Sequence, residues 1–295
     1  MTQVDFEPDA QLEPLKPWWV WSLRGFRMLN QERHAFKSGD LTLSYLDSIK
    51  GQPLLALHAH WMEGATFLQL ATDLSPDWRV IALDQRGHGY SDHSTVYTRA
   101  AYLSDIVALL DHLGLDKVAV LGNSLGGVNA YQFAARYSER VLALIVEDIG
   151  AIIDDDTSFA LAWQGIYPTR DALVEKIGER LSPALATSIR ETALGWKLTF
   201  NPEDMVASQK QLNGDHWDDW VASRCPALLI RGRESRVSDA ALFQQMAARR
   251  PRTQLVTLDG GHVVHFDNPR GFSDAVRDFL STISQTTADN TLSTM

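Results

Sequence analysis

Short apolar runs and amphipathic segments alternate along most of the chain. Six runs of four to six mostly branched apolar residues are typical of buried strands, at residues 54–58, 79–83, 117–121, 141–146, 227–231 and 254–258. Between them apolar residues recur at helical spacing, as in residues 102–110 and 131–137. Strands that alternate with helices predict an α/β fold, with a mostly parallel, doubly wound sheet covered by helices on both faces.

A hairpin is predicted ahead of this alternation. A short strand ends at Lys37, the segment Ser38-Gly39-Asp40 has turn composition, and residues 41–46 alternate between apolar and polar side chains. We therefore expect an antiparallel pair of strands at the start of the sheet.

One long interval interrupts the strands. About eighty residues separate the strand that ends at Val146 from the next one, which begins at Ala227. This interval shows helical patterns at 159–166, 171–177 and 183–194 and no buried-strand run. We expect a helical cap at 151–223, inserted between strands 6 and 7 of a core formed by 33–150 and 224–283. Such a cap would cover the carboxyl edge of the strands, where open α/β sheets bind ligands.

The two ends of the chain differ from the core in composition. An N-terminal extension, 1–32, carries Trp18, Trp19 and Trp21, and we interpret it as a segment that packs onto the body. The alternative is a homodimer contact or a membrane-surface anchor. The polar residues 284–295 predict a disordered tail.

Charge and cysteine content narrow the function classes. Lys and Arg number 27 and Asp and Glu 37, a net charge of −10 that disfavours nucleic acid and anionic membranes as partners. Acidic residues stand where a secretory signal would be basic, and no apolar run approaches a transmembrane length. A single cysteine, Cys225, excludes an intrachain disulfide, so we expect a cytoplasmic protein.

A candidate nucleophile follows the strand at 117–121. The segment Gly122-Asn123-Ser124-Leu125-Gly126 is a G-x-S-x-G motif, and a helical pattern begins immediately after it. Glycines permit the sharp turn that such a serine needs. The amino end of the following helix would favour a developing oxyanion. The pattern predicts that Ser124 is a nucleophile.

A serine hydroxyl needs a base to act as a nucleophile, and an acid to orient that base. The segment Asp259-Gly260-Gly261-His262 follows the last strand, and we assign His262 as the base. The nearby His265 is interpreted as a packing or substrate-pocket residue.

Four motifs in order resemble the α/β-hydrolase superfamily over residues 35–282. They are His-Ala-His-Trp at 58–61, Asp-Gln-Arg-Gly-His-Gly-Tyr-Ser-Asp at 84–92, the motif around Ser124, and Gly-His at 261–262. By resemblance, the backbone N–H groups of His60 and Leu125 form the oxyanion hole, and His88 is structural. The family usually has glycine at the position of Ala59.

The acid of the triad is less clear from the sequence. Where most members of the superfamily have an aspartate, after the strand at 227–231, this chain has Ser235. A small esterase branch resembles the chain in a Gly-x-x-Ser-x-Val-Ser segment at 232–238 and in an acid 24 residues after the nucleophile, which is Asp148 here. We choose Asp148, and the alternatives that stay open are Glu234, Glu147 and Asp239.

These assignments predict acyl transfer by a serine hydrolase. The substrate would be a carboxylic ester, lactone or thioester of small to medium size, held in an apolar pocket that includes Trp61, Trp163 and Tyr167. No cofactor is expected, and no metal, because the spacing of His58 and His60 lacks further ligands. The alternatives are a C–C bond hydrolase or perhydrolase with the same triad, or a ligand sensor with vestigial turnover.

Overall fold

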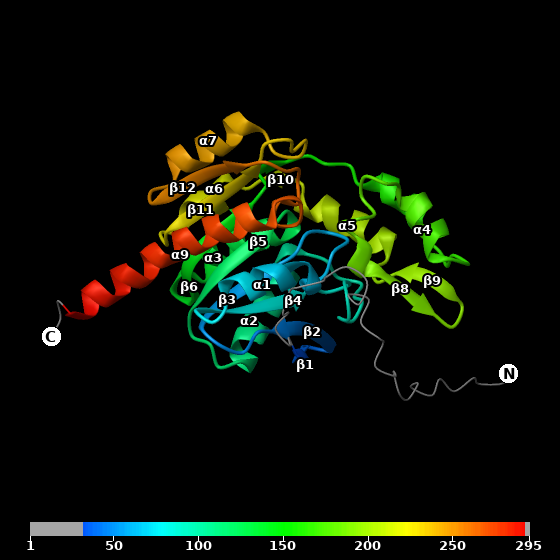
Figure 1. Ribbon diagram of the computed structural model, residues 1–295, viewed down its shortest axis with the longest axis horizontal. Coiled ribbons are helices and arrows are strands. Elements are labelled where there is room, and N and C mark those ends of the chain that lie inside the picture. The colour runs from blue at the N-terminus through cyan, green and yellow to red at the C-terminus, as the bar shows by residue number, and fades with distance from the viewer. Residues whose placement is uncertain (1–31, 293–295) are drawn as a thin grey trace.

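An eight-stranded sheet forms the centre of the protein, whose computed structural model describes the backbone of residues 32–292 and the side chains of 32–283. The strand order is β1-β2-β4-β3-β5-β6-β11-β12 (Figure 1). The strands are β1 (Glu32–Ser38), β2 (Leu41–Asp47), β3 (Gln52–Leu57), β4 (Trp78–Asp84), β5 (Val118–Asn123), β6 (Val141–Glu147), β11 (Ala227–Gly232) and β12 (Thr253–Leu258).

Strand direction agrees with the predicted fold class. The pairs β1–β2 and β2–β4 are antiparallel, and every other neighbouring pair in this sheet is parallel. The predicted hairpin is confirmed: Ser38 pairs with Leu41 around a two-residue turn in which Gly39 has a φ of 58°. The α/β fold with a mostly parallel sheet is therefore confirmed.

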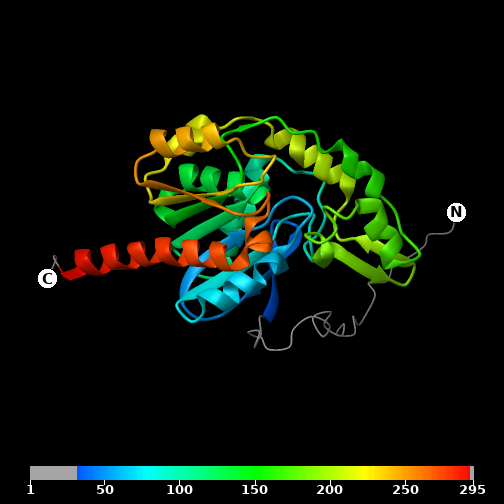
Figure 2. The same cartoon turned by 45° about the horizontal axis from the view of Figure 1, so that its top comes forward.

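Helices cover both faces of the sheet (Figures 1 and 2). One face packs against α2 (Arg99–His112), α3 (Leu125–Arg136) and α7 (Ala240–Arg249), and the other against α1 (Leu68–Leu74) and α9 (Pro269–Leu292). Alternate residues of β5 belong to different cores: Val118 and Val120 to the first, Ala119 and Leu121 to the second. Because both faces are buried, the strands are continuous apolar runs in the sequence.

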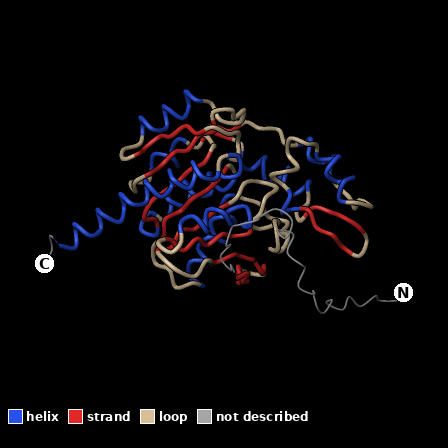
Figure 3. Tube along the Cα trace, viewed as in Figure 1, coloured by secondary structure: helices blue, strands red, loops and turns tan. Residues whose placement is uncertain are grey.

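The insertion between β6 and β11 contains short strands as well as helices (Figure 3). Its elements are β7 (Ile152–Ile153), η4 (Ser158–Trp163), α4 (Arg170–Ile177), η5 (Ala186–Ser188), β8 (Ile189–Thr192), β9 (Gly195–Leu198), α5 (Pro202–Leu212), β10 (Gly214–Asp215) and α6 (Trp217–Ala222). The elements α4, α5, β8 and β9 lie beside one end of the sheet (Figures 1 and 2).

The helical pattern predicted at 183–194 is wrong. A short 3₁₀ turn there leads into β8, which forms a hairpin with β9. The hairpin closes next to Gly195, whose φ of 128° is accessible mainly to glycine. A strand of four residues is too short for apolar periodicity to distinguish it from a helical turn.

The chain ends are described only in part. The α9 helix continues to Leu292, and the expected disorder of the tail from residue 284 stays a prediction. Extending an existing helix fixes one residue for each hydrogen bond gained, so a polar segment can continue a helix that packing has started. The extension at 1–31 and residues 293–295 lie outside the described residues. Between 32 and 292, no helix has the length and apolarity to cross a membrane.

Candidate active site

The turn between β5 and α3 holds Ser124 in an uncommon backbone conformation. Its φ is 53° and its ψ −117°, and its amide donates to the carbonyl of Glu147 over 3.1 Å. A side chain at Gly122 would collide with the carbonyl of Gly126, and one at Gly126 with the carbonyl of Leu57. The two glycines of the motif are therefore required by close backbone approach.

The first turn of α3 directs free amides toward this serine. The first backbone hydrogen bond of the helix is donated by the amide of Val128 to the carbonyl of Ser124, over 3.1 Å. The amide of Leu125 thus lies among the N-terminal groups that have no partner within a helix. Such groups, together with the helix dipole, favour negative charge at this position.

Asp148 and His262 meet at the carboxyl end of the sheet. Asp148 directly follows β6, is fully buried, and has a φ of 51°. His262 follows β12 with 26% of its side chain exposed, and its Nδ1 lies 2.8 Å from Asp148 Oδ2. An ionised carboxylate can only accept, so Nδ1 carries the proton and Nε2 is left as an acceptor.

Three further groups donate to the Asp148 carboxylate. Oδ1 accepts from the Gly232 amide at 2.9 Å and the Ser238 hydroxyl at 2.7 Å, and Oδ2 accepts from the Ser235 hydroxyl at 2.5 Å. The segment at 232–238 thus surrounds the carboxylate with donors, as a buried charge requires. Ser235, at the usual position of the acid, donates to the carboxylate one strand away.

Two alternative acids point elsewhere. Glu234 is exposed and its carboxylate accepts from the Gly260 amide at 2.5 Å. Asp239 caps α7 by accepting from the Leu242 amide at 2.8 Å. The structure therefore brings neither carboxylate to His262.

The third alternative, Glu147, pairs with the other histidine. Both residues are almost fully buried, and Glu147 Oε2 lies 2.7 Å from Nδ1 of His265, in α8 (Val264–Asp267). The opposite ring nitrogen of His265 lies 2.8 Å from the Thr66 hydroxyl, and the ring stacks on Phe67. His265 thus packs on the sheet face that α1 and α9 cover, in agreement with the first of its two interpretations, and a role in the substrate pocket stays a prediction.

Sequence reasoning missed the role of Asn123. This buried side chain donates to the carbonyl of His262 over 3.0 Å and to that of Glu147 over 3.3 Å. It therefore connects the turn of Ser124 to the loop of His262 and to the end of β6, which Asp148 follows. The signal available in the sequence was an amide at the end of an otherwise apolar strand.

The loop after β3 lies beside the nucleophile turn, because β3 and β5 are neighbours in the sheet. His60 is buried and its Nε2 lies 2.9 Å from the hydroxyl of Ser208 in α5. Trp61 has a φ of 71°, and its ring packs against those of Phe159 and Trp163 at centroid distances of 5.5 and 5.3 Å.

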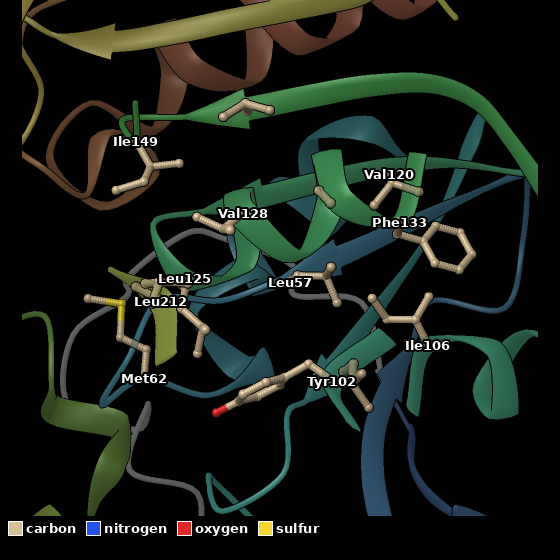
Figure 4. Close-up of a cluster of buried hydrophobic side chains, with 14 of the residues drawn as sticks. Leu57, Met62, Tyr102, Ile106, Val120, Leu125, Val128, Phe133, Ile149 and Leu212 are labelled. Atoms are coloured by element: carbon tan, nitrogen blue, oxygen red, sulfur yellow. The ribbon is translucent and has the colours of Figure 1, made fainter. Parts of the chain in front are cut away.

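The aromatic contacts join the loop to the insertion, and they belong to the same apolar core as Met62, Leu125, Ile149 and Leu212, which are shown in Figure 4. Of the predicted pocket residues, Trp61 and Trp163 lie together. Tyr167 is part of a separate contact, a backbone pairing with Trp196.

Three buried histidines near this loop predict acid sensitivity. Burial lowers the pKa of His58 to about 3, and it lowers the pKa values of His60 and His88 well below their usual range. Below pH 6.5 these histidines are protonated in the unfolded chain but remain neutral in the folded protein. The free energy of unfolding therefore decreases as the pH is lowered. We expect a loss of about 1.4 kcal/mol per pH unit for each histidine, measured by urea unfolding between pH 7 and 4.

One variant separates this effect from general acid denaturation. Replacing His58 by glutamine removes one of the three histidines and should make the pH dependence of folding stability shallower. Equal stability of the wild-type protein at pH 7 and 4.5 would contradict the prediction.

We also searched the described residues for metal sites and surface pockets. Within residues 32–283, no group of three or more His, Cys, Asp or Glu side chains is arranged to hold a metal ion. Two surface hollows, both lined by Pro226, Arg252 and Ile283, lie near the starts of β11 and β12, at the opposite edge of the sheet from Ser124.

Comparison with known proteins points to one family. Residues 52–198 match the model of the alpha/beta hydrolase fold family. The 2-(acetamidomethylene)succinate hydrolase of Mesorhizobium japonicum is 26% identical over 82% of this chain and 92% of its own length. The 2-hydroxy-6-oxo-2,4-heptadienoate hydrolase of Pseudomonas putida is 26% identical over 83% of this chain and 94% of its own. The crystal structure of an E-2-(acetamidomethylene)succinate hydrolase, at 24% identity, superposes with a TM-score of 0.76 over 85% of this chain and 99% of that one.

Proposed function

The chain belongs to the α/β-hydrolase superfamily and is a hydrolase, and from this premise we propose that it is a serine hydrolase that cleaves a carboxylic ester through an acyl-enzyme. Ser124 is the nucleophile, His262 the base and Asp148 the acid. The observation that carries the proposal is the 2.8 Å contact between His262 Nδ1 and a fully buried Asp148, because both residues follow strands whose carboxyl ends lie at the same edge of the sheet as the turn of Ser124.

The chemistry follows from which nitrogen of His262 is free. With Nδ1–H donating to Asp148, Nε2 takes the proton of the Ser124 hydroxyl as its oxygen attacks the carbonyl carbon of the ester. The amides of Leu125 and His60 hold the oxyanion, and the proton passes from His262 to the leaving alcohol. Water then attacks the acyl-enzyme by the same steps, releasing the acid and Ser124.

The insertion supports a substrate with an apolar portion. The rings of Trp61, Phe159 and Trp163 pack edge to face, and they are contributed jointly by the loop of the oxyanion hole and by the insertion. Such rings offer apolar contact to an acyl or alkyl group of small to medium size.

Active-site labelling tests the proposal. A fluorophosphonate probe should form one adduct, on Ser124 of the folded protein, and the protein should hydrolyse p-nitrophenyl esters with multiple turnovers. A protein that takes no label on Ser124 and hydrolyses no ester, thioester or lactone would instead support a ligand-sensing role.

A C–C bond hydrolase is the second candidate. It is favoured by the similarity to the Pseudomonas putida enzyme, which is named for a 2-hydroxy-6-oxo-dienoate. The two candidates are separated by assaying that dienoate beside simple esters, since only a C–C hydrolase would consume the dienoate with the higher kcat/KM.

A further inference from the structure

Arg99 places a cation inside the protein at the start of α2. Its Nη2 donates to the side-chain oxygen of Asn129, and its Nε donates to that of Gln132 over 3.1 Å. The guanidinium lies 5.2 Å from the centre of the Tyr102 ring. Both acceptors are neutral amides on α3, the helix that begins directly after Ser124.

The remaining amino group of this arginine has no partner. Nη1 is buried without a hydrogen bond, and no carboxylate among residues 32–283 lies within ion-pair distance of Arg99. Burial lowers the pKa of Arg99 to about 10, so the side chain is still a cation at neutral pH. The carboxylate of Asp219 is joined to Arg99 only through the amide of Gln132, over 3.1 and 2.7 Å, so no carboxylate contacts the guanidinium directly and Nη1 is left as a place for an anion.

Two other arginines have more acceptors than Arg99, although Nε of one of them, Arg250, is also buried without a hydrogen bond. Arg86 forms a bidentate pair with Asp105, at 2.7 and 2.8 Å. Arg250 donates to the hydroxyls of Ser223 and Thr253 and to the carbonyl of Cys225. Arg99 therefore has fewer acceptors than either.

Hydrogen bonds connect Arg99 to the candidate oxyanion loop. Asn129 donates to Gln85 over 2.6 Å, and Gln85 donates to the carbonyl of His58 over 2.7 Å. One turn along α2 from Arg99, the Tyr102 hydroxyl lies 2.9 Å from that of Ser208, which contacts His60.

Two further observations relate Arg99 to the turn of Ser124. The ring of Tyr102, which Arg99 contacts, belongs to the same apolar cluster as Met62, Leu125 and Leu212 (Figure 4). Asn129 follows Ser124 by five residues, about 7.5 Å along a helix axis. The charge of Arg99 also reaches His60, whose pKa it lowers further.

We propose that Arg99 binds a carboxylate of the substrate, so that this enzyme acts on acid-bearing esters. The inference rests on the proposed function. The carboxylate would pair with Nη1 and neutralise the guanidinium, while the scissile carbonyl lies at Ser124. The carboxylate could belong to the acyl group or to the leaving alcohol of the ester, because either would form the same ion pair with Arg99.

Matched chromogenic esters test the proposal. Mono-p-nitrophenyl glutarate and p-nitrophenyl pentanoate differ by a terminal carboxylate in place of a methyl group. 4-Methylphenyl pentanoate and 4-carboxyphenyl pentanoate place the same difference on the leaving group, and the ultraviolet absorbance of the released phenol follows their hydrolysis. In one of the two pairs we expect kcat/KM to favour the acid in the wild-type protein, and Arg99→Met to lower the ratio of acid to neutral ester by about 10- to 150-fold.

Controls separate recognition from folding and from net charge. Arg250→Met removes the same charge at the opposite edge of the sheet and should leave the ratio unchanged. Because Arg99→Met removes an unmatched buried charge, its Tm should equal or exceed that of the wild-type protein. A ratio that Arg99→Met leaves unchanged in both pairs, or lowers no more than Arg250→Met does, would overturn the proposal.

A binding measurement distinguishes failure of this inference from failure of the hydrolase proposal. Glutarate should raise the Tm of the Ser124→Ala protein and should not raise that of the double variant with Arg99→Met. Stabilisation that depends on Arg99 would support the anion site even if no ester were hydrolysed. Equal shifts in both proteins would reject it.

Discussion

Ser124→Ala is expected to lower kcat for a p-nitrophenyl ester by about a millionfold, as loss of the nucleophile does in a subtilisin-type triad. In the proposed mechanism the hydroxyl oxygen attacks the carbonyl carbon and forms the acyl-enzyme. Alanine lacks the hydroxyl, and the residue's φ of 53° comes from the glycine-flanked turn rather than from its side chain. Steady-state kinetics with protein of matched Tm measures the effect.

Ser138→Ala is the matched control for this substitution. Ser138 is exposed just beyond the carboxyl end of the helix that Ser124 precedes. Its loss should leave kcat within about twofold of wild type, as expected for a surface substitution away from the site. Turnover by Ser124→Ala within tenfold of the wild-type rate would reject the serine mechanism.

The second large effect is expected at the acid. Asp148→Asn should lower kcat by about 10⁴-fold, because an amide no longer stabilises the tautomer of His262 that carries its proton on Nδ1. The Asn oxygen can still accept from the Gly232 amide and the Ser238 hydroxyl, which lie 2.9 and 2.7 Å from Asp148 Oδ1. The variant should therefore fold, and a pre-steady-state burst assay would show slow acylation.

Glu234→Gln provides the comparison for Asp148→Asn. The Glu234 carboxylate is exposed and accepts only the Gly260 amide, a bond that a glutamine oxygen can keep. We expect this variant to retain kcat within a few-fold of wild type, as for other surface substitutions. Full activity in Asp148→Asn, or a greater loss in Glu234→Gln, would reassign the acid.

Elements with strong local patterns were predicted well. The six apolar runs are strands, although the last of them, β12, is an edge strand that is only partly buried. Helix α3 begins at Leu125, as the G-x-S-x-G motif indicated. In contrast, the segment 183–194 contains a 3₁₀ turn and a strand of a hairpin, because elements this short depend on their partner rather than on their own periodicity.

The partners of the histidines could be narrowed by sequence reasoning but not decided. Glu147 and Asp148 are adjacent in the sequence, and His262 and His265 are only three residues apart. Spacing along the chain therefore allows several pairings of these acids with these histidines. In the structure Asp148 contacts His262 while Glu147 turns to the opposite side of the sheet and contacts His265. The unmatched guanidinium of Arg99 likewise has no signature in the sequence, because burial and missing partners are properties of packing.

The sequence by itself determined the α/β alternation and the strained turn at Ser124, because both depend on residues close together in the chain. Only the tertiary structure decided which acid meets His262, how Asn123 connects the turn of Ser124 to the loop of His262 and where Arg99 lies. These contacts join residues far apart in sequence, and they exist because the parallel order of β5, β6, β11 and β12 brings the carboxyl ends of these strands to one edge.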